Sequence, residues 1–350
     1  MPKGSCRVVA RVPNIPAPYA TYKRPRPILT VPESRAMPRL RRRLAVAAAL
    51  LAAAVCDRGD PALGRSIDHP DFPADAAWVF VTDQVSTGPR YAGTRSHDRT
   101  RRWLVEQLSF RADTVVLDSF PHRTAEGKRV MMTNVLARFR PDEPRRILLV
   151  THWDTHPKAD ESADPFDRTR PVAGANVGAS GTALLVAVAE TFRQQPPPVG
   201  VDLLFTDGDD FEAEKLLGTE RFIATRPQGY RPAFAIVLDA VADRNAWLPQ
   251  DAASRRAAPR IVHRVWGIAK QMRRDSVFVA DAVADQKGPH ALLSAAGIPA
   301  VRVWDPELGP GNSHWRTVND LPSNASRETL ALVGEVITEV VYRGIPEAKP

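Results

Sequence analysis

Two apolar segments of the chain each end in side chains that can bind metals or move protons. One segment runs into His152 and Asp154, and the other runs into Asp209 and Asp210. His152 and Asp154 are two residues apart, so on a strand they share a face, where the carboxylate can fix the tautomer of a ligating histidine. Ligands of open α/β sheets bind beyond the carboxyl ends of the strands, so the pattern predicts a metallohydrolase-like site there.

A third acid, Asp239, also ends an apolar segment, and a Gly-rich turn at residues 172–181 leads into an Ala-, Leu- and Val-rich helix. From Arg146 onward, apolar segments alternate with helical ones, which indicates βαβ crossovers. The expected fold class is therefore α/β, a three-layer α/β/α domain with a mostly parallel mixed central sheet. Two strands around a polar turn should form its antiparallel edge. The expected strands are 114–120, 130–138, 147–151, 201–206, 234–238 and 300–304, and the expected helices are 98–108, 181–194, 258–273 and 328–341.

Three motifs follow one another in the order His-x-Asp, Gly-Ala-Asn-x-Gly-Ala-Ser-Gly and Asp-Gly-acid-acid. This order resembles the zinc exopeptidases that include bacterial leucyl aminopeptidases and glutaminyl-peptide cyclotransferases. The resemblance extends from Trp78 to Tyr342, and the intact acidic pair favours the cyclotransferase-like branch. It implies zinc as cofactor and one role for each matching residue: His152, Asp210 and Asp239 as metal ligands, Asp209 as general acid/base and Asp154 as the support of His152.

Three positions depart from the resembled pattern. Val177 stands where the family has the Asp that bridges two zinc ions, or binds the single zinc of the cyclotransferases. Arg316 stands where the family has a ligand His, and Lys287-Gly-Pro-His290 lacks the acid before its His. An isopropyl group offers a metal nothing, and a guanidinium is a permanent cation. Because a catalytic zinc needs about three protein ligands, we expect an impaired or altered metal centre.

Two arrangements would reconcile these changes. In the first, His314 moves into place and completes an altered zinc site with the three ligands named above. In the second, Arg316 takes over the charge of the metal and neutralises Asp209, Asp210 and Asp239. The second is slightly favoured, because it explains why the ligands and the cation change together.

The resemblance implies a protein that acts on peptide N-termini. In a cyclotransferase, zinc would polarise the side-chain amide of an N-terminal Gln while Asp209 carries a proton from the α-amine to the departing ammonia. In an aminopeptidase, Asp209 would activate a water that attacks the first peptide bond, with a metal as Lewis acid. The alternative is a non-catalytic protein of the cell envelope, in which Asp209, Asp210 or Asp239 holds the amine of a peptide or small ligand.

The N-terminal residues have the pattern of an export signal. We expect residues 1–36 to be an extension upstream of the true start at Met37. Residues 37–56 combine a basic region with an apolar run, residues 44–55, within the roughly 7 to 15 residues of secretory signals. A membrane span needs roughly 18 or more, so a transmembrane anchor is not favoured.

Cys56 closes the apolar run where the lipid-bearing cysteine of a lipoprotein would stand. The only other cysteine is Cys6, so the exported chain can form no internal disulfide. The expected location is the bacterial cell envelope, either periplasmic or anchored through a lipid on Cys56. Residues 57–76 should be a tether, and residues 77–345 the exopeptidase-like domain.

The net charge of +8 does not indicate a nucleic-acid surface. Residues 1–56 hold 11 Lys and Arg and one acidic residue, which leaves 37 basic and 39 acidic residues from Asp57 onward. The excess positive charge therefore belongs to the segment that export would remove. Nucleic acid is excluded as a partner on this ground.

Overall fold

The computed structural model describes residues 60–212 and 215–346. Every described residue belongs to one compact unit. The expected extension, the signal peptide and Cys56 lie outside the described residues. Within the described part, no helix is long and apolar enough to cross a membrane.

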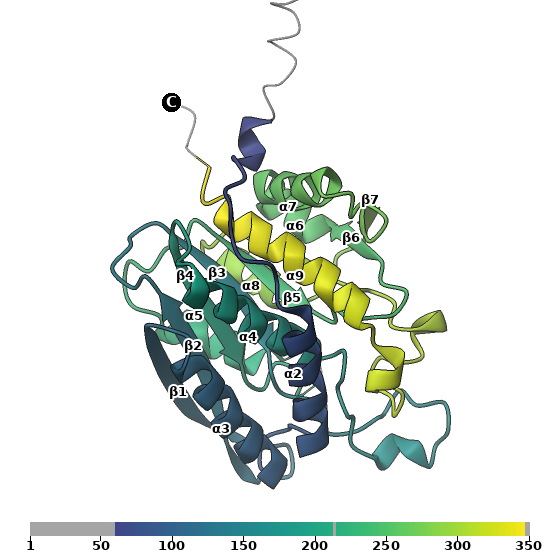
Figure 1. Ribbon diagram of the computed structural model, residues 1–350. Coiled ribbons are helices and arrows are strands. Elements are labelled where there is room, and N and C mark those ends of the chain that lie inside the picture. Colours follow the sequence, from purple (N-terminus) through teal and green to yellow (C-terminus); the bar gives the residue numbers. More distant parts are fainter. Residues whose placement is uncertain (1–59, 213–214, 347–350) are drawn as a thin grey trace, which may run out of the picture. The chain divides into compact units, whose positions relative to one another are not determined.

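A six-stranded mixed sheet forms the middle layer, with strand order β1-β2-β4-β3-β5-β8 (Figure 1). Strands β4, β3, β5 and β8 run parallel to one another, whereas β2 is antiparallel to both β1 and β4. This arrangement confirms the expected α/β class and its antiparallel edge. The strands are β1 (Thr114–Arg123), β2 (Arg129–Phe139), β3 (Arg146–His152), β4 (Gly200–Thr206), β5 (Phe234–Asp239) and β8 (Ala300–Trp304).

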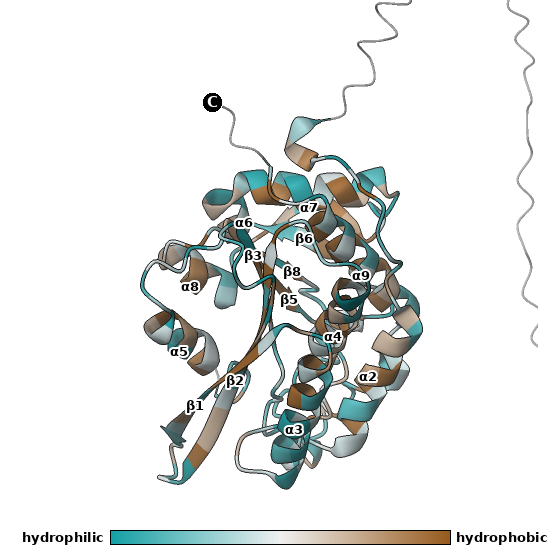
Figure 2. Cartoon of the chain, turned by 60° about the vertical axis from the view of Figure 1, so that its left-hand side comes forward, coloured by the Kyte–Doolittle hydropathy of each residue, from teal (hydrophilic) through white to brown (hydrophobic). Residues whose placement is uncertain are grey.

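Helices cover both faces of the sheet, which completes the three layers (Figure 2). Helices α2, α3, α4, α7 and α9 enclose the larger apolar core, and α5 and α8 enclose a smaller one on the opposite face. A separate parallel pair, β6 (Leu248–Asp251) and β7 (Phe278–Val283), lies outside the main sheet. The helices are α2 (Ala74–Thr87), α3 (Arg95–Ser109), α4 (Ala179–Gln194), α5 (Leu217–Thr225), α6 (Ala252–Ala257), α7 (Pro259–Gln271), α8 (Pro289–Ala295) and α9 (Arg327–Tyr342).

The central strands are predominantly apolar because both of their faces are covered. Ile147 and Leu149 of β3 enter the larger core, and Leu148 and Val150 enter the smaller one. Successive strand residues point to opposite faces, so a strand covered on both sides holds a polar side chain only together with a buried partner, as Asp202 of β4 is paired with Arg146. Polar groups therefore gather where these strands end.

Two glycines let the Gly-rich turn and α4 approach the end of β3. Gly178 has a φ of 87°, and a Cβ there would lie 2.4 Å from the backbone oxygen of Asp154. At Gly181 a Cβ would lie 2.2 Å from Thr151 Oγ1. Only glycine fits these contacts, and together they hold Val177 beside the carboxyl end of the sheet.

The segment expected as a tether packs on the domain where the structure describes it. Leu63 and Phe72 are buried, and α2 already begins at Ala74. A Cβ at Gly334 of α9 would lie 2.3 Å from the Phe72 ring, so the ring rests directly on the helix backbone. Two bulky apolar side chains account for the difference, because a free tether would leave them in water.

Candidate functional site

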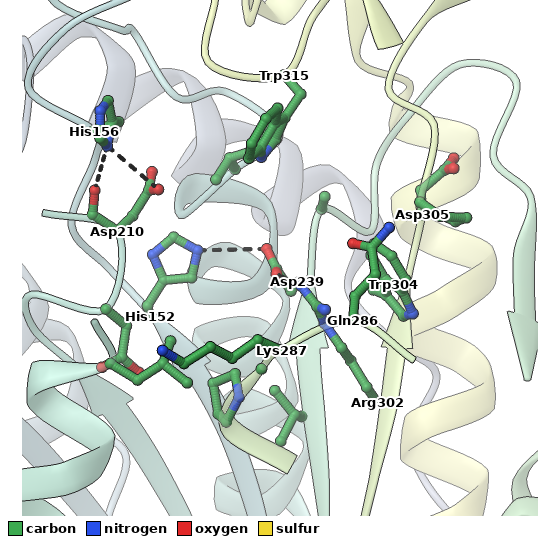
Figure 3. A pocket seen from close by; sticks show the side chains of 18 of the residues that line it. His152, His156, Asp210, Asp239, Gln286, Lys287, Arg302, Trp304, Asp305 and Trp315 are labelled. Carbon is green, nitrogen blue, oxygen red and sulfur yellow. Dashed lines mark hydrogen bonds and ion pairs between the residues drawn. The ribbon is translucent and has the colours of Figure 1, made fainter. Parts of the chain in front are cut away.

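A pocket of about 430 Å³ opens at the carboxyl ends of β3, β4, β5 and β8 (Figure 3). This is the place expected for a ligand in an open α/β sheet. The polar lining includes His152, His156, Asp209, Asp210, Asp239 and Arg302. The apolar lining includes Val177, Trp304, Leu308 and Trp315.

His152 lies between two carboxylates. Its Nδ1 is 3.2 Å from Asp154 Oδ1. Its Nε2 is 3.4 Å from Asp239 Oδ1, a contact that Figure 3 shows as a dashed line. Burial lowers the pKa of His152, but the hydrogen bonds to Asp154 and Asp239 outweigh it, so the net pKa lies well above the ordinary value. The imidazole is thus fixed in orientation and favoured as a cation.

Asp154 supports the site through contacts with two of its residues, His152 and Asp210. Its side chain is fully buried, and its Oδ2 accepts a hydrogen bond of 3.0 Å from the backbone N–H of Asp210. One carboxylate thus orients two parts of the site. It fixes the His152 ring at the end of β3, and it binds the backbone of the turn that follows β4. Asp154 does not itself line the pocket.

Asp209 has its carboxylate occupied by protein donors. Thr206 Oγ1 donates to its Oδ2 at 2.7 Å, Thr219 Oγ1 to the same oxygen at 2.5 Å, and the Thr219 N–H to its Oδ1 at 2.9 Å. Burial raises the pKa of Asp209, and these hydrogen bonds oppose the rise. The bonds fasten the end of β4 to the first turn of α5, so the carboxylate has a structural task besides its place in the pocket.

Asp210 differs from its neighbour. Its Oδ1 lies 3.8 Å from His156 Nδ1, and within the described residues its carboxylate receives no hydrogen bond. His156 instead donates from Nδ1 to the backbone oxygen of Asp210 at 2.7 Å. Burial raises the pKa of Asp210 to about 8; the positive charge of His152 opposes the rise, and Asp154 and Asp239 add to it.

Asp239 is paired with a cation that the sequence did not point to. Arg302 Nη2 lies 2.5 Å from Asp239 Oδ2, and the Arg302 guanidinium stacks on the Trp304 ring, 4.0 Å from its centroid. Burial raises the pKa of Asp239, but Arg302 and His152 outweigh it, so the net pKa falls below its usual range. The carboxylate is therefore held as an anion by two protein cations.

Arg316 does not neutralise Asp209 or Asp239, which corrects the arrangement favoured from the sequence. It forms an ion pair with Asp160, and its Nη2 donates to His156 Nε2 at 2.9 Å. Arg316 was expected among the strand-end acids because the sequence could not show that the loop after β3 carries its own counter-charge. The positive charge of Arg316 lowers the pKa of Asp210, but less than the other named groups change it.

The structure does not bring His314 to the other nominal ligands. His314 is absent from the pocket lining, its Nδ1 lies 3.8 Å from Asp243 Oδ2, and a Cβ at Gly309 would lie 2.4 Å from its ring. The backbone of the preceding loop thus holds the imidazole away. The other five proposed residues, His152, Asp154, Asp209, Asp210 and Asp239, do come together at the strand ends.

Two site residues were missed from the sequence. His156 lies in the loop after β3, and no spacing rule distinguishes it from a surface histidine. Arg302 left a signal, because it interrupts the apolar strand Ala-Val-Arg302-Val-Trp, and a buried arginine requires a counter-charge. That counter-charge is Asp239.

The side chains present do not form a zinc site. Among residues 60–212 and 215–346, no group of three or more His, Cys, Asp or Glu is arranged to hold a metal ion. Val177 packs with Ala240 and Leu308 in an apolar cluster where a bridging carboxylate would be needed. With Arg302 on one carboxylate and Arg316 beside His156, the donor set does not fit zinc.

Comparison with known proteins agrees with the motifs. Residues 134–341 match the profile of Peptidase family M28. A Zn-dependent exopeptidase from Parabacteroides distasonis superposes with a TM-score of 0.75 at 29% identity, covering 79% of this chain and 99% of that one. Tannerella forsythia glutaminyl cyclase gives 0.74 at 29% identity, covering 78% of this chain and 99% of that one. A leucine aminopeptidase precursor from Bacteroides thetaiotaomicron gives 0.73 at 29% identity, covering 79% and 99%.

A curated relative is matched over a shorter stretch. The alkaline phosphatase isozyme conversion protein of Escherichia coli (strain K12) is 26% identical over 128 residues, 35% of this chain. The match spans 36% of that protein, about a third of its length. The family match and the structural matches confirm the resemblance that the order of the motifs predicted.

Proposed function

Because the chain belongs to peptidase family M28, we propose that its pocket receives the N-terminus of a peptide and binds the α-ammonium group through Asp210, without zinc. The structural relatives named glutaminyl cyclase and leucine aminopeptidase precursor support a ligand with a free amino end. The proposal departs from the Zn-dependent exopeptidase of Parabacteroides distasonis in replacing a metal by the charge of the ligand.

The observation that carries the proposal is the difference between three pocket acids. Asp209 accepts three hydrogen bonds from Thr206 and Thr219, and Asp239 is paired with Arg302. Among the residues that the structure describes, the carboxylate of Asp210 has as its partner the His156 ring alone, 3.8 Å away. A mostly buried carboxylate that receives no hydrogen bond is costly to ionise, as its raised pKa shows, so a ligand cation beside it would stabilise the ionised form strongly.

The walls of the pocket suit the first residue or two of a peptide. Trp315 is 38% exposed and offers an indole surface at the pocket, and Val177 and Leu308 add apolar area. A cavity of about 430 Å³ lies within the roughly 300 to 1,000 Å³ of small-molecule sites. A peptide would thus place its ammonium on Asp210 and its first side chain against these walls.

Calorimetric titration tests the requirement for the amine. The probes are the peptides Gln-Ala-Ala and Leu-Ala-Ala, each with a free and with an acetylated N-terminus. Acetylation removes the positive charge, so we expect binding to weaken about 10- to 100-fold. Equal affinity for the free and acetylated forms would show that the amine is not what the pocket recognises.

Matched variants locate the contact. Asp210→Asn keeps the size of the side chain and removes the carboxyl group, which the ammonium of a bound peptide would hold ionised in spite of its raised pKa. Binding of the peptide with a free N-terminus should therefore weaken by a similar factor. Glu212→Gln removes a charge from the rim of the same pocket, where His122 and Lys215 already pair with it, and should change affinity less than about threefold. A loss in both variants would point to the general charge of the pocket rather than to Asp210.

We expect no turnover of these peptides. The donor set does not fit zinc, and both oxygens of Asp209, the nominal general acid/base, already accept hydrogen bonds from threonines. Mass spectrometry of each peptide after incubation would detect loss of ammonia from N-terminal Gln or release of N-terminal Leu. Either product, formed by wild type and not by Asp209→Asn, would make the protein an enzyme instead.

We also propose that the protein is exported, with residues 37–56 as its signal. The proposal rests on the basic and apolar pattern of that segment alone. Intact-mass measurement of the mature chain from membrane and soluble fractions tests it. A chain that begins at Cys56 with an added lipid mass supports anchoring, a cut near residue 56 without lipid supports periplasmic release, and an uncut chain contradicts export.

A further inference from the structure

Arg302 is fixed in the wall of the pocket from two sides. It lies on β8, where the parallel register pairs it with Val237 and pairs Trp304 with Asp239. Its Nη2 contacts Asp239 Oδ2 at 2.5 Å, and its guanidinium covers the Trp304 ring. The residue is 8% exposed. If the Arg302 side chain left this position, it would lose both a charged hydrogen bond and a cation–π contact.

The neighbouring half of the pocket would otherwise suit a metal. His152 Nε2 and Asp239 Oδ1 lie 3.4 Å apart. With zinc bonds of roughly 2.0 to 2.2 Å, two ligand atoms of one tetrahedral ion are separated by about this distance. Asp154 orients His152 from behind, as a supporting carboxylate does for a ligating histidine.

We propose that Arg302 excludes divalent metal ions from the His152 and Asp239 half of the pocket and supplies the positive charge that Asp239 requires. A guanidinium on one oxygen of a carboxylate repels a divalent ion on the other, and burial weakens the screening by water. The departures visible in the sequence, at Val177, at Arg316 and before His290, are therefore not the whole reason that the side chains present do not fit zinc.

This inference goes beyond the proposed function and does not depend on it. Peptide binding is a property of Asp210, whereas metal exclusion is a property of Arg302. The two are measured with different ligands, so one can fail while the other holds.

Reconstruction of the metal site tests the inference. Zinc binding is measured by calorimetry, and zinc content by elemental mass spectrometry after dialysis. The four proteins are wild type, Val177→Asp/Arg316→His, the same double variant with Arg302→Met, and the double variant with Arg302→Lys as the control that keeps the charge. The readout is the metal itself, so it requires no activity.

We expect the double variant to bind zinc weakly in spite of its restored ligands. Adding Arg302→Met should tighten binding about 100-fold, and adding Arg302→Lys should tighten it less than about threefold. The inference is overturned if the double variant already binds zinc as tightly as the Met triple variant, or if the Lys and Met triple variants bind alike.

A folding control keeps the test decisive. Circular dichroism and thermal unfolding establish that each variant is folded before titration. If Arg302→Met does not fold, Arg302→Gln replaces it, because Gln keeps a donor for Asp239 without the charge. The same tightening is then expected, and its absence in a folded Gln variant overturns the inference equally.

Discussion

The carboxylate of Asp154 accepts the backbone N–H of Asp210 at 3.0 Å while its other oxygen lies 3.2 Å from His152 Nδ1. The end of β3 and the turn after β4 are thus joined through one fully buried side chain. The sequence resemblance gave Asp154 the task of supporting His152, and the contact to Asp210 adds a second task. The position of the proposed ammonium-binding carboxylate depends on it.

Asp154→Ala should therefore weaken both the fold and the pocket. The change leaves an imidazole N–H and a backbone N–H without their acceptor in a buried place. We expect the free energy of unfolding to fall by about 2 to 4 kcal/mol and binding of Gln-Ala-Ala to weaken. Urea unfolding followed by fluorescence measures the first, with Asp142→Ala at an exposed position as control. A loss no larger than that of the control would contradict the role of this contact.

Asp202 of β4 should be more critical to stability than any surface acid. It is fully buried and accepts hydrogen bonds from Arg138, Arg146 and the Tyr230 hydroxyl, at distances of 2.7 to 3.0 Å. Asp202→Ala leaves the buried Arg146 guanidinium without its counter-charge, so the free energy of unfolding should fall by about 3 to 5 kcal/mol. If Asp202→Ala unfolds at the same urea concentration as wild type, the network is not what joins β2, β3 and β4.

The ion pair of His69 and Glu339 should make stability depend on pH in two directions. His69 Nε2 lies 2.7 Å from Glu339 Oε2, and both side chains are mostly buried. Burial raises the pKa of Glu339, but hydrogen bonds from His69, Ser66 and Arg343 outweigh it and lower it to about 2. The bond to Glu339 is in turn the largest cause of the raised pKa of His69, which burial opposes.

The signs follow from linkage. The lowered pKa of Glu339 gives stability above its unfolded value of 4.5, which is lost as the pH falls toward 2. The raised pKa of His69 gives stability below 6.5, which is lost as the pH rises through its folded value. The difference in unfolding free energy between wild type and Glu339→Gln should therefore peak between about pH 4.5 and 6.5, at up to about 3 kcal/mol. Urea unfolding across pH 3 to 9 measures it, and a flat difference would be the contrary result.

The central strands of the main sheet could be predicted because both of their faces are covered. Residues 147–151 and 201–206 are mostly apolar, with Asp202 inside the second, and lead into histidine or acids. They became β3 and β4 almost to the residue. The helix expected at 98–108 begins earlier, at Arg95, because the Thr94 side chain caps the His97 N–H. A local cap of this kind moves a boundary without changing the apolar pattern.

The ligand-like acids could be predicted, but their partners could not. Asp239 ends an apolar strand, which identifies it, whereas its pairing with Arg302 depends on the register of β5 and β8, 63 positions apart in sequence. His314 and Arg316 lie two residues apart, yet one is held against Gly309 and the other reaches His156. The conformation of that loop decides between them, and residue types alone do not give it.

The central claim is that the pocket binds a peptide N-terminus through Asp210 without a metal. The most direct measurement is the affinity of wild type and Asp210→Asn for Gln-Ala-Ala, once in excess EDTA and once in excess zinc chloride. We predict that the wild-type dissociation constants agree within about twofold and that Asp210→Asn is weaker in both solutions. Binding that disappears in EDTA and returns with zinc would contradict the account.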